Sequence, residues 1–221
     1  MIDTLLSLAA PHHCCGCNKV GSLLCPNCKY NIISESKNVC LACGRPSFGP
    51  GVCNTCKLPY SRAWCVGERK DVLQRLVGIY KFERTKSAYR DLAELLDDIL
   101  PQLPIGTVIV PIPTVPAHIR ERGYDHTLLL ARRLGRIRKL PVAKLLVRST
   151  NTMQRHATAA TRGLQAKSAF KLVGNVDKNI NYLIIDDVVT TGATVRYAAK
   201  ALKDAGASQV WVAVLARQTL D

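Results

Sequence analysis

The sequence predicts an α/β fold, with a parallel sheet flanked by helices and a small cysteine-rich module before it. The apolar run 182–185 is short and bounded by turn signals, which is typical of a buried parallel strand. A helical pattern over 193–206 and a second apolar run over 209–216 follow, and this spacing suits a right-handed βαβ unit. We therefore expect a metal-binding module at residues 1–60 and an α/β domain at residues 61–221.

Eight of the ten cysteines form four Cys-x-x-Cys pairs, and this spacing lets two thiolates meet one tetrahedral Zn²⁺. Bulky apolar residues are sparse here, and a structural zinc site can supply the missing stability, about 10–16 kcal/mol. The pattern predicts two structural Zn²⁺ sites in a double zinc ribbon, with four thiolates each. Sequential pairing fits this pattern, and a cross-braced pairing stays open. The ligands would be Cys14, Cys17, Cys25, Cys28, Cys40, Cys43, Cys53 and Cys56.

Three other uses of these cysteines compete with zinc binding. Disulfides are disfavoured because the start of the sequence has no basic region and carries Asp3, unlike an export signal. A redox Cys-x-x-Cys normally appears once, and four evenly repeated pairs give iron–sulfur ligation little support.

We also expect Pro26, Pro46 and Pro50 to interrupt any helix in this module.

The chain carries a formal net charge of +15 and has no apolar run near the ~18 residues of a membrane span. We expect a cytoplasmic protein without a membrane span. Residues 118–171 hold thirteen Lys and Arg against two acidic residues. Such a field favours a polyanion, either pyrophosphate in a closed pocket or a nucleic-acid backbone, and composition does not choose between them.

The stretch before the first apolar run contains further elements. Residues 62–67 alternate like a short strand, and 71–82 and 87–100 carry apolar stripes at helical spacing. Their charged faces are expected to be solvated. Residues 108–113 read as the first central strand, and a helix is expected around 128–134.

The candidate site follows the strand over 182–185. Asp186 and Asp187 stand at its carboxyl end, where ligands bind in open α/β sheets. A hydroxyl-rich loop and a helix N-terminus come next, and backbone N–H groups with the helix dipole attract an anion there. Gly192 allows a phosphate to approach the backbone closely. The alternative is an ordinary strand, turn and Thr-capped helix.

This run resembles the phosphoribosyl-pyrophosphate (PRPP) signature of type I phosphoribosyltransferases. The resemblance implies a catalytic acid pair, Asp186 and Asp187, that holds the ribose hydroxyls, with Mg²⁺ mainly bridging pyrophosphate oxygens. It implies 5′-phosphate binding by Val188, Val189, Thr190, Thr191, Gly192, Ala193 and Thr194. It also implies that the loop after the first central strand binds pyrophosphate, and we expect Arg120 and Arg122 to be the donors, because the planar guanidinium suits phosphate oxygens.

Two further blocks narrow the resemblance. The run Arg120-x-Arg122-Gly-Tyr-Asp-His is similar to the Arg-x-Arg-Gly-aromatic-Asn-Gln motif of the ComF family, which also has an N-terminal Cys-x-x-Cys module. Here Asp125 and His126 replace the amide pair. The region from Arg148 to Phe170 resembles that family's third block, with matches at Arg148, Thr150, Gln154, Arg162, Ala169 and Phe170. Its long polar segment predicts an active-site lid with Arg162 as a donor. A basic loop without function is the alternative.

The resemblance implies a phosphoribosyltransferase that binds PRPP and Mg²⁺ and acts in DNA uptake during natural transformation, or competence. Such chemistry depends on positioning and charge stabilisation, which agrees with the absence of an obvious Ser/His/Asp constellation. Two alternatives remain. One is a non-catalytic protein that binds single-stranded DNA, against which the low aromatic content of 5% argues. The other is a scaffold whose zinc ribbons dock a helicase-like partner.

Overall fold

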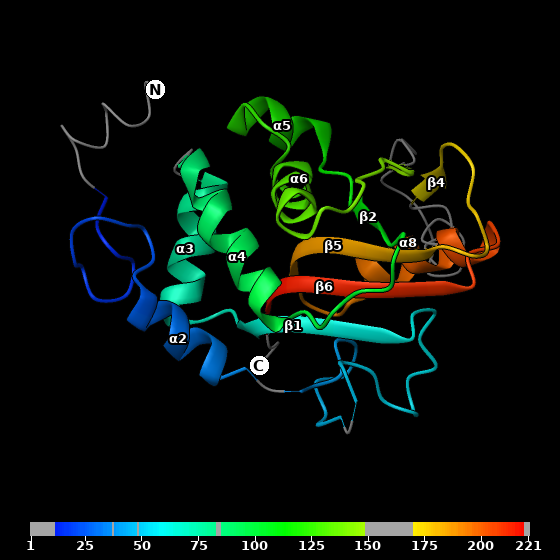
Figure 1. Cartoon of the computed structure of the whole chain (residues 1–221), viewed down its shortest axis with the longest axis horizontal. Coiled ribbons are helices and arrows are strands. Elements are labelled where there is room, and N and C mark those ends of the chain that lie inside the picture. The colour runs from blue at the N-terminus through cyan, green and yellow to red at the C-terminus, as the bar shows by residue number, and fades with distance from the viewer. Residues whose placement is uncertain (1–11, 37, 48, 83–84, 149–169, 219–221) are drawn as a thin grey trace, which may run out of the picture.

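The computed structural model describes residues 12–36, 38–47, 49–82, 85–148 and 170–218. Its centre is a four-stranded parallel sheet in the order β1-β6-β5-β2 (Figure 1). The sheet and its flanking helices confirm the predicted α/β fold. The strands are β1 (Arg62–Glu68), β2 (Val108–Pro111), β5 (Asn181–Val189) and β6 (Gln209–Arg217).

Successive side chains of a strand point to opposite faces of the sheet. Because the side chains on both faces are apolar here, helices cover both faces. Leu183 and Ile185 face the core formed with α3 (Asp71–Phe82), α4 (Tyr89–Ile99) and α6 (His126–Arg138). Tyr182 and Ile184 face the opposite core, which includes α8 (Ala193–Asp204). Every residue from 181 to 187 is buried, as expected for a strand covered on both faces.

Smaller elements complete the described chain. The 3₁₀ helix η1 (Lys86–Ala88) precedes α4, and α5 (Pro116–Arg122) lies between β2 and α6. The strands β3 (Leu146–Arg148) and β4 (Phe170–Leu172) form a separate antiparallel pair, close to α8. No helix in the described part of the chain is both long and apolar enough to cross a bilayer.

The second part of the cysteine-rich segment lies along β1, the edge strand of the sheet, while its first part lies beside α3 (Figure 1). The backbone N–H of Ala63 donates to the carbonyl of Pro50 at 2.8 Å, and the Ser36 hydroxyl donates to the carbonyl of Cys65 at 3.1 Å. These bonds satisfy groups that an open edge would leave free. The segment therefore closes the sheet on one side.

The expectation that Pro26 interrupts a helix is wrong. The structure has α2 (Pro26–Ser34), and Pro26 is among its first residues. Proline is tolerated at this position because the first helical N–H groups have no intrahelical partner and the ring already fixes a helical φ.

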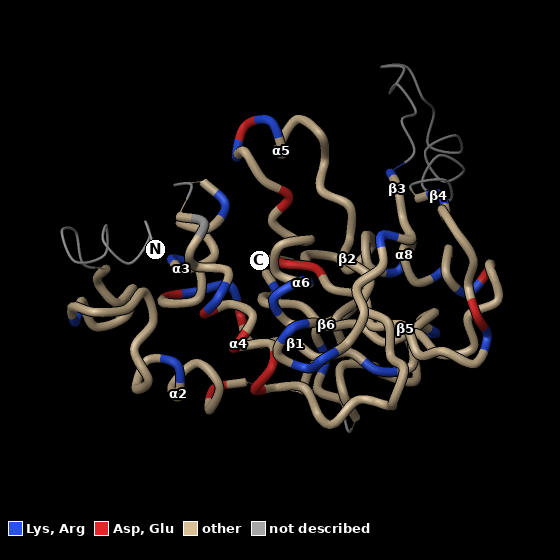
Figure 2. Tube along the Cα trace, turned by 45° about the horizontal axis from the view of Figure 1, so that its top comes forward, with Lys and Arg blue, Asp and Glu red and all other residues tan. Residues whose placement is uncertain are grey.

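The expectation that the charged helix faces are only solvated is also wrong. Acidic residues of α4 lie beside basic residues of the neighbouring α6 (Figure 2). Arg138 pairs with Asp97, and Arg133 lies 3.8 Å from Glu94. Part of the basic charge predicted to face a polyanion is therefore neutralised inside the fold.

Candidate functional site

The two carboxylates lie within the carboxyl-terminal half of β5. Asp186 and Asp187 are 8% and 5% exposed. The strand continues through Val188 and Val189, which pair with Ala216 and Arg217 of β6. The turn that connects β5 to α8 is therefore residues 190–192, shorter than the loop predicted from the sequence.

Asp187 is held by two side chains from different helices. Its Oδ2 lies 2.8 Å from Nζ of Lys81 at the end of α3 and 2.5 Å from Nε2 of His126 at the start of α6. Arg122 donates from Nη1 to Nδ1 of the same imidazole at 2.9 Å. Because a guanidinium only donates, Nδ1 accepts and Nε2 carries the hydrogen that points to Asp187.

These surroundings shift the pKa values of the two carboxyl groups in opposite directions. Burial opposes ionisation of Asp187, but the hydrogen bond from His126 and the charge of Lys81 hold its pKa below the usual range. Burial and the neighbouring charge of Asp187 raise the pKa of Asp186 to about 7. Adjacent residues in the chain thus provide one fixed anion and one group that titrates near neutral pH.

The start of α6 fixes the imidazole. Asp125 is the N-cap, and its Oδ1 accepts the backbone N–H of Leu128 at 3.1 Å and the hydroxyl of Thr114 at 2.8 Å. The hydroxyl of Tyr80 donates to the carbonyl of His126 at 2.7 Å. The loop after β2 and the helix α3 together place His126 beside Asp187.

The turn before α8 exposes its polar groups. Thr190, Thr191 and Ala193 are exposed, and Thr194 is half-buried. Gly192 is the N-cap of α8 with a φ of 70°, and as a glycine it has no side chain to cap the helix. The N–H of Ala193 donates to the Thr191 hydroxyl in a long hydrogen bond of 3.4 Å. The exposed N–H groups and hydroxyls at this end of α8 can receive an anion.

The predicted arginines have different positions. Arg122 is buried near the acid pair, its guanidinium lies 5.6 Å from the ring centre of Phe82, and its Nε has no hydrogen-bond partner among the described residues. Arg120 is exposed on α5. The predicted lid donor Arg162 lies outside the described residues.

The eight paired cysteines form two clusters with the sequential pairing, and not the cross-braced one that the spacing left open. One contains Cys14, Cys17, Cys25 and Cys28, and the other contains Cys40, Cys43, Cys53 and Cys56, with all sulfurs of a cluster within 4.8 Å of one another. The Sγ atoms of Cys17 and Cys25 lie 3.6 Å apart, and those of Cys43 and Cys53 lie 3.8 Å apart. A tetrahedral Zn²⁺ with Zn–S bonds of about 2.3 Å requires a separation of about 3.8 Å. Each cluster can therefore hold a structural zinc ion.

Local donors favour a thiolate at one cysteine of each cluster, Cys14 and Cys43. Burial opposes ionisation of Cys14, but backbone N–H groups, including that of Cys25 at 3.3 Å, lower its pKa to about 6. The backbone and side chain of Arg45 lower the pKa of Cys43 to about 6. Cys15 and Cys65 stay outside the clusters, and burial raises the pKa of Cys65 to about 12.

Comparison with known proteins identifies the family. The model of the phosphoribosyl transferase domain matches residues 123–219, which include the acid pair and the turn. The DNA utilization protein YhgH of Salmonella typhi is 31% identical over 206 residues, covering 84% of this chain and 86% of that protein. The competence protein ComFC of Bacillus subtilis is 26% identical over 196 residues, covering 83% and 79%. The chain belongs to the ComF family.

One solved structure similar to this ComF chain is the adenine phosphoribosyltransferase of Leishmania tarentolae. The two are 16% identical with a TM-score of 0.39, and the match covers 64% of this chain and 74% of that one.

The ComF motif after β2 has a local structural explanation. Gly123 ends α5 with a φ of 81°, a left-handed conformation that glycine adopts without a steric cost. Asp125, in place of the commoner Asn, caps α6. Asn is an equally good cap, so the replacement preserves this function of the motif.

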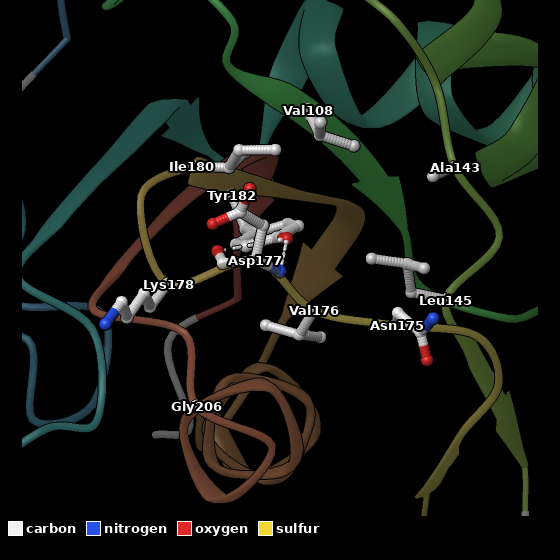
Figure 3. A pocket seen from close by; sticks show the side chains of 10 residues that line it. All are labelled: Val108, Ala143, Leu145, Asn175, Val176, Asp177, Lys178, Ile180, Tyr182 and Gly206. Atoms are coloured by element: carbon white, nitrogen blue, oxygen red, sulfur yellow. Dashed lines mark hydrogen bonds between the residues drawn. The ribbon is translucent and has the colours of Figure 1, made fainter.

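A groove of about 700 Å³ lies at the amino-terminal ends of β2 and β5 (Figure 3). Its lining includes Val108 at the start of β2, Tyr182 near the start of β5, and Gly206 just after α8. The groove is therefore separate from the acid pair, which lies toward the carboxyl ends of the same strands.

The sequence did not indicate three contacts of the site. The helical pattern places Lys81 on a face expected to be solvated, and in the sequence His126 is only a departure from the family motif. The third contact is the approach of the second cysteine cluster to the turn, which the sequence did not predict. In the structure, an added Cβ at Gly192 would lie 3.2 Å from the carbonyl oxygen of Leu41. The position of Lys81, last but one in an amphipathic helix before a polar stretch, was the available signal.

Proposed function

We propose that this ComF protein is a phosphoribosyltransferase that binds PRPP with Mg²⁺ toward the carboxyl ends of β5 and β2. The observation that supports this most directly is the exposed Thr190–Thr191 turn, which follows a buried acid pair and leads through a positive-φ glycine into the start of α8. In the proposal, this turn and the first N–H groups of α8 bind the 5′-phosphate.

The remaining side chains divide the other tasks. Asp186 accepts a ribose hydroxyl, while Asp187 holds Lys81 and His126 in place, because its Oδ2 is already engaged by both. Arg122 supplies a donor to pyrophosphate. Since Asp187 is paired, Mg²⁺ would be held mainly by substrate oxygens, with Asp186 as the available protein carboxylate. The ion would neutralise part of the pyrophosphate charge.

The proposed reaction is a substitution at C1′ of the ribose. A nucleophilic acceptor forms a bond to C1′, the bond from C1′ to the pyrophosphate oxygen breaks, and pyrophosphate leaves with the bonding electrons. The acceptor loses its proton to solvent. The protein accelerates this step by positioning and by stabilising charge on the leaving group.

The test is calorimetric titration of Mg²⁺ and PRPP into the wild type and into Asp186→Asn. We expect the variant to bind about 10- to 100-fold more weakly, because a charged acceptor is lost. Asp177→Asn is the matched control, since this residue lines the groove at the amino-terminal ends of β2 and β5, away from the acid pair. Equal affinity of the wild type and Asp186→Asn, with both folded by circular dichroism, would contradict the proposed site.

We place this activity in DNA uptake or utilisation, because relatives carry the names competence protein and DNA utilization protein. Binding of single-stranded DNA is the second candidate function. It is favoured by six exposed basic residues among the described part of the region 118–171, which are Arg120, Arg132, Arg136, Lys139, Lys144 and Lys171. A steep fall of DNA affinity with salt would indicate extensive phosphate contacts. Docking of a helicase-like partner through the zinc ribbons stays a prediction, as does the domain boundary after residue 60.

A further inference from the structure

The two cysteine clusters support different parts of the molecule. Cys14, Cys25 and Cys28 are buried in the core that contains α3, α4 and α6. Leu41, which lies between two cysteines of the second cluster, is fully buried in the core on the other face of the sheet, the one that contains α8. Zinc at each site therefore acts on a different structural unit.

The second cluster contacts the phosphate-binding turn directly. A Cβ built on Gly192 would lie 3.2 Å from the carbonyl oxygen of Leu41 and 3.5 Å from the Cα of Ala42. Leu41 also belongs to the same buried cluster as Val189 and Val195, which flank the turn on β5 and α8. The backbone inside this Cys-x-x-Cys pair thus packs on the residue that caps the helix.

The second cluster is in turn fixed to the sheet. The N–H of Leu41 donates to the carbonyl of Gly51 at 3.2 Å, and the N–H of Ala63 in β1 donates to Pro50. The guanidinium of Arg217, at the end of β6, packs under Gly44, where an added Cβ would lie 2.5 Å from its Nη2. Leu41 and Ala42 lie between Cys40 and Cys43, two members of the cluster, so the geometry of the four sulfurs also constrains the position of their backbone.

We infer that zinc at the second cluster positions the turn 190–192 for phosphate binding. The four thiolates fix the Leu41–Ala42 backbone, and that backbone holds Gly192 in its left-handed conformation at the start of α8. Leu41 and Ala42 are positioning residues in this inference, which rests on the proposed function of the turn. Zinc at the first cluster has no such contact with the turn among the described residues.

The test compares Cys43→Ser with Cys17→Ser. Each replaces the exposed second cysteine of the first Cys-x-x-Cys pair in its cluster, so the two are matched. Native mass spectrometry should show that each variant loses one zinc ion. Titration with Mg²⁺ and PRPP should then show at least about tenfold weaker binding for Cys43→Ser than for Cys17→Ser, within the usual range of coupling between sites.

A second pair keeps all eight thiolates. Leu41→Ala and Leu24→Ala truncate buried leucines beside a cysteine of the second and first cluster, respectively. The inference expects weaker PRPP binding only for Leu41→Ala, with two zinc ions retained in both. This pair decides the question if loss of a cysteine unfolds the chain.

Hydrogen exchange of the amides in 190–195 provides a readout without ligand. These amides should exchange faster in Cys43→Ser and Leu41→Ala than in their first-cluster counterparts. Equal exchange and equal affinity within each pair would overturn the inference. If the wild type fails to bind PRPP, the proposed function is wrong, and hydrogen exchange alone decides whether the cluster orders the turn.

Discussion

Asp186 and Asp187 show at the scale of single residues how neighbouring carboxyl groups acquire different chemistry. Lys81 and His126 converge on Asp187, whereas Asp186 accepts only the backbone N–H of Asp187 at 2.9 Å among the hydrogen bonds of its side chain in the described structure. Ionisation of one raises the cost of ionising the other. The pair therefore carries one firm negative charge and a second group that ionises near neutral pH.

This difference predicts how stability depends on pH. The pKa of Asp186 is about 7 in the folded chain against 3.8 for an ordinary aspartate, so its contribution to stability is complete below about pH 4 and is lost as pH rises through 7. The charge penalty is absent in Asp186→Asn. Between pH 5 and 8, we expect the unfolding free energy of the variant to gain about 2–3 kcal/mol relative to the wild type.

Urea unfolding of both proteins at pH 5 and pH 8 measures this gain. Zinc binding also varies with pH, but it affects both proteins alike and leaves their difference unchanged. A difference that stays constant across this range would show that Asp186 does not titrate there.

At the scale of elements, the start of α6 links the loop after β2 to the acid pair. Asp125 caps the helix and receives the Thr114 hydroxyl, while the next residue, His126, contacts Asp187. A substitution of Asp125 therefore affects the hydrogen bonds that hold the start of α6 and, through them, the position of the His126 imidazole.

The cap gives a comparison of two substitutions. Asp125→Ala should lower the unfolding free energy by about 1–2 kcal/mol, because the N–H of Leu128 and the hydroxyl of Thr114 lose their acceptor. Asp125→Asn keeps an acceptor oxygen and restores the residue common in ComF proteins, so it should remain close to the wild type. Thermal unfolding followed by circular dichroism separates these results. A variant with Asn as unstable as the one with Ala would show that the negative charge, not the cap, is what matters.

At the scale of the whole molecule, the cysteine-rich segment packs against β1, the edge strand of the sheet. It satisfies backbone groups of β1 and contributes residues to the cores on both faces of the sheet. Metal-dependent order in this segment is therefore transmitted to the sheet.

Removal of the metal tests this arrangement. Native mass spectrometry should show two zinc ions per chain, unchanged in Cys15→Ser and Cys65→Ser, whose thiols lie outside the clusters. Treatment with a chelator should lower the thermal midpoint and accelerate hydrogen exchange in β1 more than in β2, because β1 depends on the cysteine segment for its edge contacts. A chain with one zinc ion or none would contradict the two-site assignment.

The sequence by itself determined the parallel sheet, the order of its main helices and the four Cys-x-x-Cys pairs, because these follow from local hydrophobic period and ligand spacing. The structure decided which pairs share a cluster. The sequence also marked Asp186, Asp187 and the turn, which are contiguous in the chain. Only the tertiary structure decided that Lys81 and His126 contact Asp187 and that Arg122, not Arg120, contacts the imidazole of His126. It also decided that the Leu41 backbone packs against Gly192. These contacts join residues up to about 150 positions apart, and no local pattern encodes which distant side chains meet once the chain packs.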